Sequence, residues 1–73
     1  MKNKYVLRNR IKDFRIEKNL SQGELAAKVG VSRNSISSIE VGQYSPTAKL
    51  AYLICLVLEK KFEDVFYLSF EGV

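Results

Sequence analysis

Three signals for the start or end of a helix lie within twelve residues near the middle of the sequence. Ser21 and Glu24 have the spacing of a capping box, in which the serine hydroxyl accepts from the third helical N–H and the glutamate accepts from the serine N–H. Gly30 stands where a helix ends in a left-handed residue, and Ser32 is the next N-cap. Two short helices are therefore predicted to follow each other through a tight turn, which is the helix-turn-helix geometry.

Apolar residues at helical spacing extend this pair of helices into a bundle. Leu7, Ile11 and Phe14 form a stripe that predicts a helix before the capping box. Ser45 is expected to cap a later helix, with Pro46 at its first helical position, where the missing N–H costs nothing. The predicted helices cover residues 9–18, 22–29, 33–41, 46–58 and 62–66.

The two ends of the sequence have a different pattern. Residues 4–8 and 66–70 are rich in β-branched and aromatic side chains, and we expect them to pair as a small β-ribbon. The predicted fold class is mainly all-α, a compact bundle of four to five helices with this terminal ribbon. At 73 residues, the chain is expected to form a single domain over 1–73, with the helix-turn-helix at residues 21–40.

Composition argues against several classes of protein. Cys55 is the only cysteine and there is no histidine, so no disulfide within the chain and no thiolate or imidazole metal site is expected. The longest apolar run, residues 50–58, is too short to span a bilayer, and the N-terminus does not resemble a signal peptide. We expect a cytoplasmic protein that is not an enzyme and has no metal, cofactor or small-molecule ligand.

Charge is unevenly distributed along the sequence. Residues 1–33 have nine basic and three acidic side chains, a net charge of +6, whereas residues 34–73 have three basic and five acidic ones, a net charge of −2. This asymmetry fits either a nucleic-acid partner or an ordinary solvated surface. Lys2 and Lys4 are expected to belong to a solvated tail, with an arm in the DNA minor groove as the alternative.

The second helix of the predicted pair has an unusual polar face. Ile36 and Ile39 are its only large apolar residues before Val41, and the other side chains are small or suited to hydrogen bonding. Arginine can bond a guanine in two places and asparagine an adenine, while serines let a helix approach the DNA groove closely. These properties predict that the helix reads DNA through Arg33, Asn34, Ser35, Ser37 and Ser38.

The stretch SQGELAAKVGVSRNSISSIEVGQYSPT resembles the Cro/C1-type, or XRE, helix-turn-helix family, whose fold is of the lambda-repressor-like DNA-binding type. The resemblance implies that Gln22 binds a phosphate, that Arg33, Asn34 and Ser38 are the main base readers, and that Arg15 and Glu40 form a partly buried ion pair. The remaining residues that we assign to the DNA surface are Ser32, Ser35, Ser37, Gln43 and Tyr44.

The fourth predicted helix is apolar on all sides, so it should be buried on all sides. The register of the family points one set of side chains into the bundle, namely Ala48, Ala51, Ile54, Cys55 and Leu58. The outward set, Leu50, Leu53, Leu56 and Val57, is then expected to form a homodimer interface within a dimerisation helix and tail at residues 46–73. Phe62 and residues 67–70 are further candidates for the same interface.

These expectations define one leading function and two alternatives. The leading function is a sequence-specific transcriptional regulator, a dimeric repressor that reads a near-palindromic operator in double-stranded DNA. The first alternative is a protein-interaction module, such as the antitoxin of a toxin–antitoxin pair. The second is a basic structural or RNA-associated protein without base readout.

Overall fold

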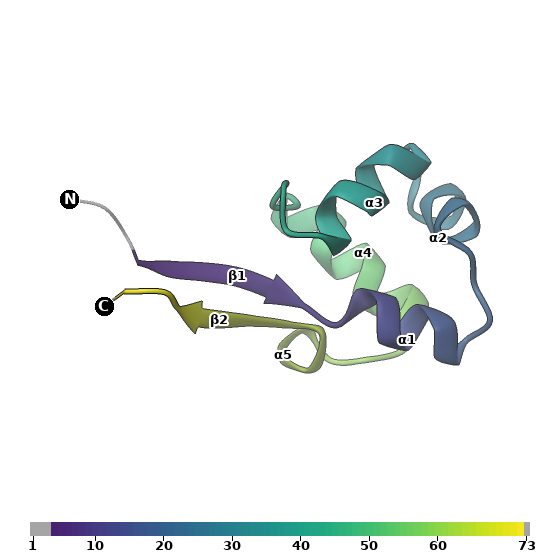
Figure 1. Ribbon diagram of the computed structural model, residues 1–73. Coiled ribbons are helices and arrows are strands. Elements are labelled where there is room, and N and C mark those ends of the chain that lie inside the picture. The colour runs from purple at the N-terminus through teal and green to yellow at the C-terminus, as the bar shows by residue number, and fades with distance from the viewer. Residues whose placement is uncertain (1–3, 73) are drawn as a thin grey trace.

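The computed structural model describes residues 4–72 and confirms the mainly helical fold with a small antiparallel ribbon (Figure 1). The helices form a bundle, and the ribbon projects away from it with both ends of the chain at its tip. Lys2, part of the expected tail, lies outside the described residues. In chain order the elements are β1 (Tyr5–Asn9), α1 (Ile11–Glu17), α2 (Gln22–Val29), α3 (Arg33–Glu40), α4 (Ala48–Leu58), α5 (Phe62–Val65) and β2 (Phe66–Phe70).

Local caps fix the ends of α2 and the start of α3, as predicted. The Ser21 hydroxyl accepts from the Glu24 N–H at 3.0 Å, and the Glu24 carboxylate accepts from the Ser21 N–H at 2.8 Å. The hydrogen bond from the Ser21 backbone is the main reason that the pKa of Glu24 lies below its usual value. Gly30 ends α2 with a left-handed φ of 78°, and Ser32 caps α3 by accepting from the Ser35 N–H.

The predicted starts of α1 and α4 were wrong by two residues each. Asn9 ends strand β1, and its side chain accepts from the Ile11 N–H, so α1 begins at Ile11. The N-cap of α4 is Thr47, not Ser45, because the Thr47 hydroxyl accepts from the Leu50 N–H at 3.2 Å. Pro46 therefore precedes the helix instead of opening it.

The ribbon joins the two ends of the chain and packs its base on the bundle. Its strands are antiparallel, with Tyr5 opposite Phe70 at the tip and Asn9 opposite Phe66 at the base. Phe66 is buried in the core, and the Arg10 N–H donates to the Val65 carbonyl at 2.8 Å where the ribbon meets α1 and α5. The base of the ribbon is thus fixed to the bundle, whereas its tip extends beyond it (Figure 1).

One core collects side chains from all five helices and from β2. Burial raises the pKa of the Cys55 thiol, which makes it a small apolar residue of this core. Within residues 4–72, none of the helices is long and apolar enough to cross a membrane. The buried apolar residues are Ile11, Leu25, Ala26, Val29, Ile36, Ile39, Leu50, Ala51, Ile54, Cys55, Leu58, Val65 and Phe66.

Two glycines should respond to alanine in opposite directions. A Cβ at Gly23 would lie 3.9 Å from Ser21 Oγ and 4.0 Å from Arg33 Cδ, which are ordinary contacts. Gly23→Ala should therefore stabilise the fold by about 0.5 kcal/mol, because the unfolded chain loses freedom, and raise Tm by about 2–4 °C. Gly30→Ala should lower stability by about 1 kcal/mol, because its φ of 78° disfavours any Cβ. Thermal unfolding followed by circular dichroism measures both, and a Gly23→Ala variant less stable than the wild type would contradict this assignment.

Candidate nucleic-acid interface

A buried ion pair between α1 and α3 holds the candidate interface in place. Arg15 Nε donates to Glu40 Oε2 at 2.7 Å and Nη2 donates to Oε1 at 3.3 Å. The two side chains are only 10% and 4% exposed. Arg15 Nη1 also donates to the Leu20 carbonyl at 2.8 Å, in the loop that leads into α2. One arginine thus fixes the end of α3 and the approach to α2, as a structural residue and not as a DNA contact.

Gln22, at the start of α2, belongs to the same network. Its Nε2 donates to Glu40 Oε1 at 3.1 Å, a contact that no sequence pattern predicts. An amide nitrogen carries two hydrogens, so the bond to Glu40 orients the side chain and leaves one donor available. The family resemblance implies that Gln22 binds a phosphate. The remaining side-chain donor and the free N–H groups of the helix N-terminus suit that role.

The polar face of α3 is open to solvent. Arg33 and Asn34 are exposed, and in the described part of the chain their side chains make no hydrogen bond or ion pair. Asn34, Ser35 and Ser38 line one shallow hollow together with Tyr44, which comes from the loop after the helix. The structure therefore brings four of the predicted DNA-binding residues onto one surface, with Arg33 at the N-terminal end of the same helix.

The serines of α3 do not all have the same freedom. The Ser32 hydroxyl caps the helix and lies 3.1 Å from the Ser35 hydroxyl, so both groups already have a local partner. Ser37 and Ser38 are half-buried on the helix. Of these four side chains, Ser38 is the one that combines a place in the hollow with a hydroxyl not used in the cap.

The loop after α3 turns back tightly and presents the remaining predicted residues. The Gly42 N–H donates to the Ile39 carbonyl at 3.0 Å, and the Gln43 N–H donates to the Ser38 carbonyl at 2.9 Å. Gly42 has a φ of 82°, which favours glycine. Because of this turn, Gln43 and Tyr44 are exposed next to the α3 surface.

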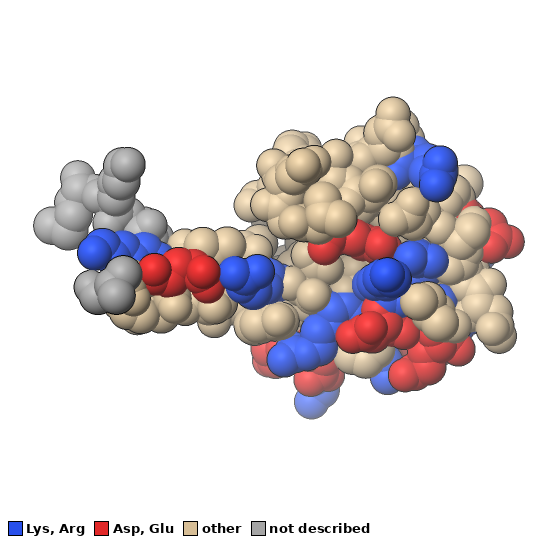
Figure 2. Space-filling view, in the orientation of Figure 1, with Lys and Arg blue, Asp and Glu red and all other residues tan. Residues whose placement is uncertain are grey.

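The uneven distribution of charge along the sequence does not produce one basic side and one acidic side in the folded protein. Lys18 Nζ lies 2.7 Å from a Glu59 carboxylate oxygen and Arg8 Nη2 lies 3.0 Å from one of Glu71, so basic residues of the first half pair with acids of the second. Figure 2 shows blue and red side chains intermixed over the face turned to the viewer. The excess positive charge of residues 1–33 is therefore partly neutralised, and charge alone does not define a DNA-binding face.

The outward face predicted for α4 is only partly correct. Leu50 is 8% exposed and belongs to the core, whereas Ala48, expected inside, is exposed. Leu53 is half-buried against the core, and Leu56 is 73% exposed. The sequence pattern could not separate these residues because every side of the helix is apolar.

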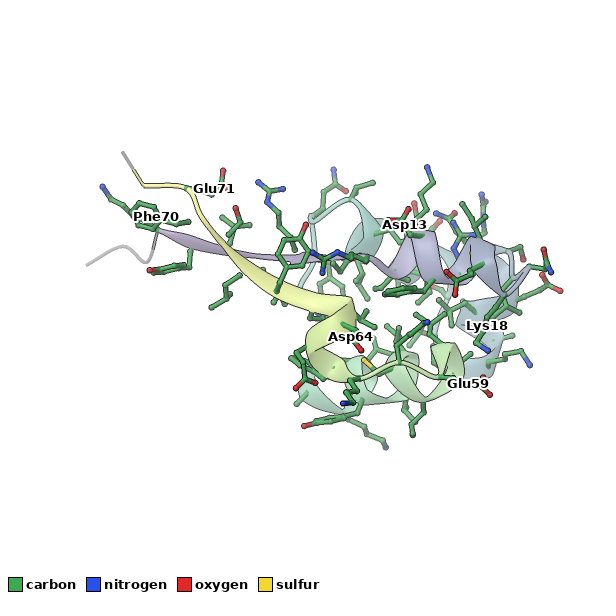
Figure 3. The ribbon with its side chains drawn as sticks, turned by 90° about the horizontal axis from the view of Figure 1, so that it is seen from below. Asp13, Lys18, Glu59, Asp64, Phe70 and Glu71 are labelled. Carbon is green, nitrogen blue, oxygen red and sulfur yellow. The ribbon has the colours of Figure 1, made fainter. Side chains whose placement is uncertain are left out.

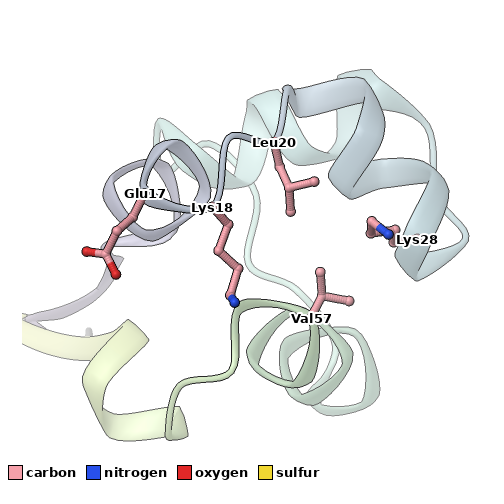
Figure 4. Close-up of a pocket in the computed structure, with 5 residues that line it drawn as sticks. All are labelled: Glu17, Lys18, Leu20, Lys28 and Val57. Atoms are coloured by element: carbon pink, nitrogen blue, oxygen red, sulfur yellow. The ribbon is translucent and has the colours of Figure 1, made fainter.

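Val57 lies neither in the core with Leu50 nor on the exposed side of α4 with Leu56. It is half-buried and lines an open hollow between the ends of α1, α2 and α4 with Leu20 (Figure 4). Lys18, Lys28 and Glu17 form the rest of this hollow. Leu56 and Val57, predicted to share one interface, therefore belong to different surfaces.

The buried ion pair should be costly to break from one side. Glu40→Ala leaves the Arg15 guanidinium buried without its partner, and we expect a loss of about 3–5 kcal/mol of unfolding free energy. Urea denaturation followed by circular dichroism measures this loss. Glu17→Ala, which removes the exposed pair with Lys60, is the control and should leave the midpoint unchanged. Equal midpoints for Glu40→Ala and the wild type would show that the pair is not a structural anchor.

Comparison with known proteins agrees with this geometry. The profile of a helix-turn-helix family matches residues 11–65. An uncharacterized HTH-type transcriptional regulator of Archaeoglobus fulgidus is 50% identical over 60 residues, 82% of this chain and 84% of that protein. The uncharacterized HTH-type regulator YgzD of Bacillus subtilis is 40% identical over 66 residues, 90% of this chain and 100% of that protein.

Among solved structures, a putative DNA-binding protein from Bacteroides fragilis has a similar fold, with a TM-score of 0.77 at 24% identity. The alignment covers 85% of this chain and 100% of that one. The matched region contains the capped α2–turn–α3 unit and the ion pair that holds it. The chain belongs to the Cro/C1-type (XRE) helix-turn-helix family, whose members are DNA-binding transcriptional regulators and not enzymes.

Proposed function

We propose that the protein is a sequence-specific repressor that binds a near-palindromic operator as a homodimer. The observation that carries this proposal is the exposed face of α3, where Asn34, Ser38 and Tyr44 share one hollow and Arg33 lies at the helix start. Repression requires only that the bound protein occupies its site on DNA. The short α3 suits this role, because its thin apolar side packs inward and its small polar side can approach base edges.

Within this proposal, base contacts and phosphate contacts come from different elements. Arg33 and Asn34 have free donors and acceptors on α3, so they are the residues proposed to read bases in the major groove. Gln22 at the α2 N-terminus and Tyr44 after α3 lie on either side of the reading helix in sequence and are proposed to bind phosphates. Phosphate contacts would fix the position of α3, and base contacts would provide sequence preference.

Two copies would double this limited reading surface. An eight-residue helix presents few side chains to the groove, so one copy can discriminate among only a few base pairs. A two-fold dimer places two such helices about 34 Å apart, one turn of DNA, on related half-sites. The near-palindrome in the proposal follows from this symmetry.

Alanine at the proposed base readers should reduce specificity. After selection of the preferred duplex from a random pool, Asn34→Ala and Arg33→Ala should each weaken binding to it by about 1–3 kcal/mol per lost base contact. Binding to random duplex should change little for Asn34→Ala. Fluorescence anisotropy across a series of salt concentrations measures both. Lys12→Ala, an exposed basic residue of α1, is the matched control for loss of charge.

Two results would contradict the proposal. A wild-type protein without sequence preference would favour the basic structural or RNA-associated alternative. Unchanged preference in both Asn34→Ala and Arg33→Ala would show that another surface reads the bases. Gln22→Ala serves as a separate check, because loss of a phosphate contact should weaken binding to every duplex by a similar factor.

A further inference from the structure

The terminal ribbon has two chemically different faces. Residues directly opposite each other in an antiparallel pair point to the same side of the sheet. The register pairs Tyr5 with Phe70 and Leu7 with Leu68, so one face of the ribbon consists of apolar side chains towards its tip. The Tyr5 and Phe70 rings lie 5.2 Å apart, in agreement with this placement.

The opposite face of the ribbon makes its own polar contacts. Arg8 Nη2 donates to a Glu71 carboxylate oxygen at 3.0 Å, and the Ser69 hydroxyl donates to the same oxygen at 2.8 Å. The Arg10 guanidinium lies 4.1 Å from the centre of the Tyr67 ring. In Figure 2, charged side chains are visible along the ribbon. This face is suited to water, whereas the apolar face is not.

The apolar face continues onto the bundle without a break. Phe66, at the base of the ribbon, stacks on Phe62 of α5 with ring centres 5.0 Å apart. Phe62 lies 5.6 Å from the Tyr52 ring of α4, and Leu56 is one helical turn beyond Tyr52. A single apolar surface therefore extends from Phe70, labelled at the tip of the ribbon in Figure 3, to the exposed side of α4.

This surface is large for a protein of this size. Its exposed members are between 39% and 73% exposed: Tyr5, Tyr52, Leu56, Phe62, Leu68 and Phe70. With about 200 Å² for each fully exposed side chain of this kind, they present on the order of 700 Å². The largest apolar patch of a typical monomer is about 300–600 Å², and a stable interface buries about 800 Å² of each partner. The surface therefore has the area that one protein partner would cover.

We infer that a second copy of this chain covers the surface, with the apolar ribbon face and the Tyr52–Leu56 side of α4 contacting the same residues of the partner about a two-fold axis. This inference rests on the proposed dimeric repressor. Of the interface expected from the sequence it keeps Leu56, Phe62 and the ribbon residues Leu68 and Phe70, and it leaves out Leu50, Leu53 and Val57. Four of the six residues are aromatic and none is charged, so the surface that covers them must itself be largely apolar, and a second copy presents such a surface. A self-complementary apolar patch is what a two-fold dimer requires.

The arrangement of the elements is compatible with DNA binding. In Figure 1, α3 lies along the upper side of the bundle and α5 along the lower side. A contact through α5 and the ribbon leaves α3 open. It would also stabilise the ribbon, because two paired strands alone are at best marginally stable in water and this ribbon extends beyond the bundle.

Charge placed on the surface should separate the two copies. The wild type should sediment as a dimer at micromolar concentration. Leu68→Glu on the ribbon and Leu56→Glu on α4 should each raise the dimer dissociation constant by about 100-fold or more, because the carboxylate would be buried without a partner. Both positions are exposed in the single chain and lie outside its core, so the variants should keep the helical signal of the wild-type circular dichroism spectrum. Ile16→Glu is the matched control, an exposed apolar residue of α1 outside the surface, and should remain dimeric.

The outcomes separate this inference from the proposed function. A monomeric wild type at about 100 µM, or Leu68→Glu and Leu56→Glu variants as dimeric as the control, would overturn the inferred interface. In either case, Asn34-dependent preference for one duplex would still support sequence-specific reading of DNA by α3. Conversely, a dimer broken by Leu68→Glu in a protein without sequence preference would support the interface and contradict the proposed DNA reading.

Discussion

The buried pair between Arg15 and Glu40 is the interaction on which the arrangement of the helices depends. Each helix of this protein is too short to be stable alone, so the angle between α2 and α3 must be fixed by contacts between elements. Arg15 reaches α3 through Glu40 and the loop before α2 through the Leu20 carbonyl. Glu40 in turn bonds Gln22 at the start of α2. These hydrogen bonds hold α1, α2 and α3 in fixed positions relative to one another. The Arg15 and Glu40 side chains are largely shielded from water, in an environment where electrostatic interactions are strong.

This network also connects stability with recognition. Gln22 is the residue proposed to bind phosphate, and its side chain is oriented by the same carboxylate that neutralises Arg15. A phosphate at the α2 N-terminus would therefore meet a donor whose direction is already set, which reduces the entropy lost on binding. Arg33 and Asn34, the residues proposed to read bases, differ from Gln22: they are exposed, and their side chains have no partner in the described part of the chain. A rigid frame with free side chains on one helix is well suited to an interface that must fit DNA closely.

Several other charged side chains form ion pairs within the protein. Lys18, Lys60 and Arg8 each pair with an acidic residue distant in sequence. Attraction to DNA through the overall field is thereby weakened, since each paired cation contributes less to the surface potential. The ribbon and α5, which carry most of the apolar surface, lie away from α3 in the fold (Figure 1). The two candidate surfaces can consequently act at the same time, one towards nucleic acid and one towards protein.

The sequence by itself determined the local structure of the α2–turn–α3 unit: the capping box at Ser21, the left-handed end at Gly30 and the cap at Ser32 all lie where their pattern predicts them. These features depend on hydrogen bonds between residues at most a few positions apart, so the order of side chains is sufficient to define them. The Arg15–Glu40 ion pair was predicted only from the resemblance to the family. Only the tertiary structure decided that Leu50 is buried and Leu56 exposed, because on a helix that is apolar all round burial depends on which neighbours arrive from elsewhere in the chain. The bond between Gln22 and Glu40 and the register that places Tyr5 opposite Phe70 join residues far apart in the sequence, so only the folded chain shows them.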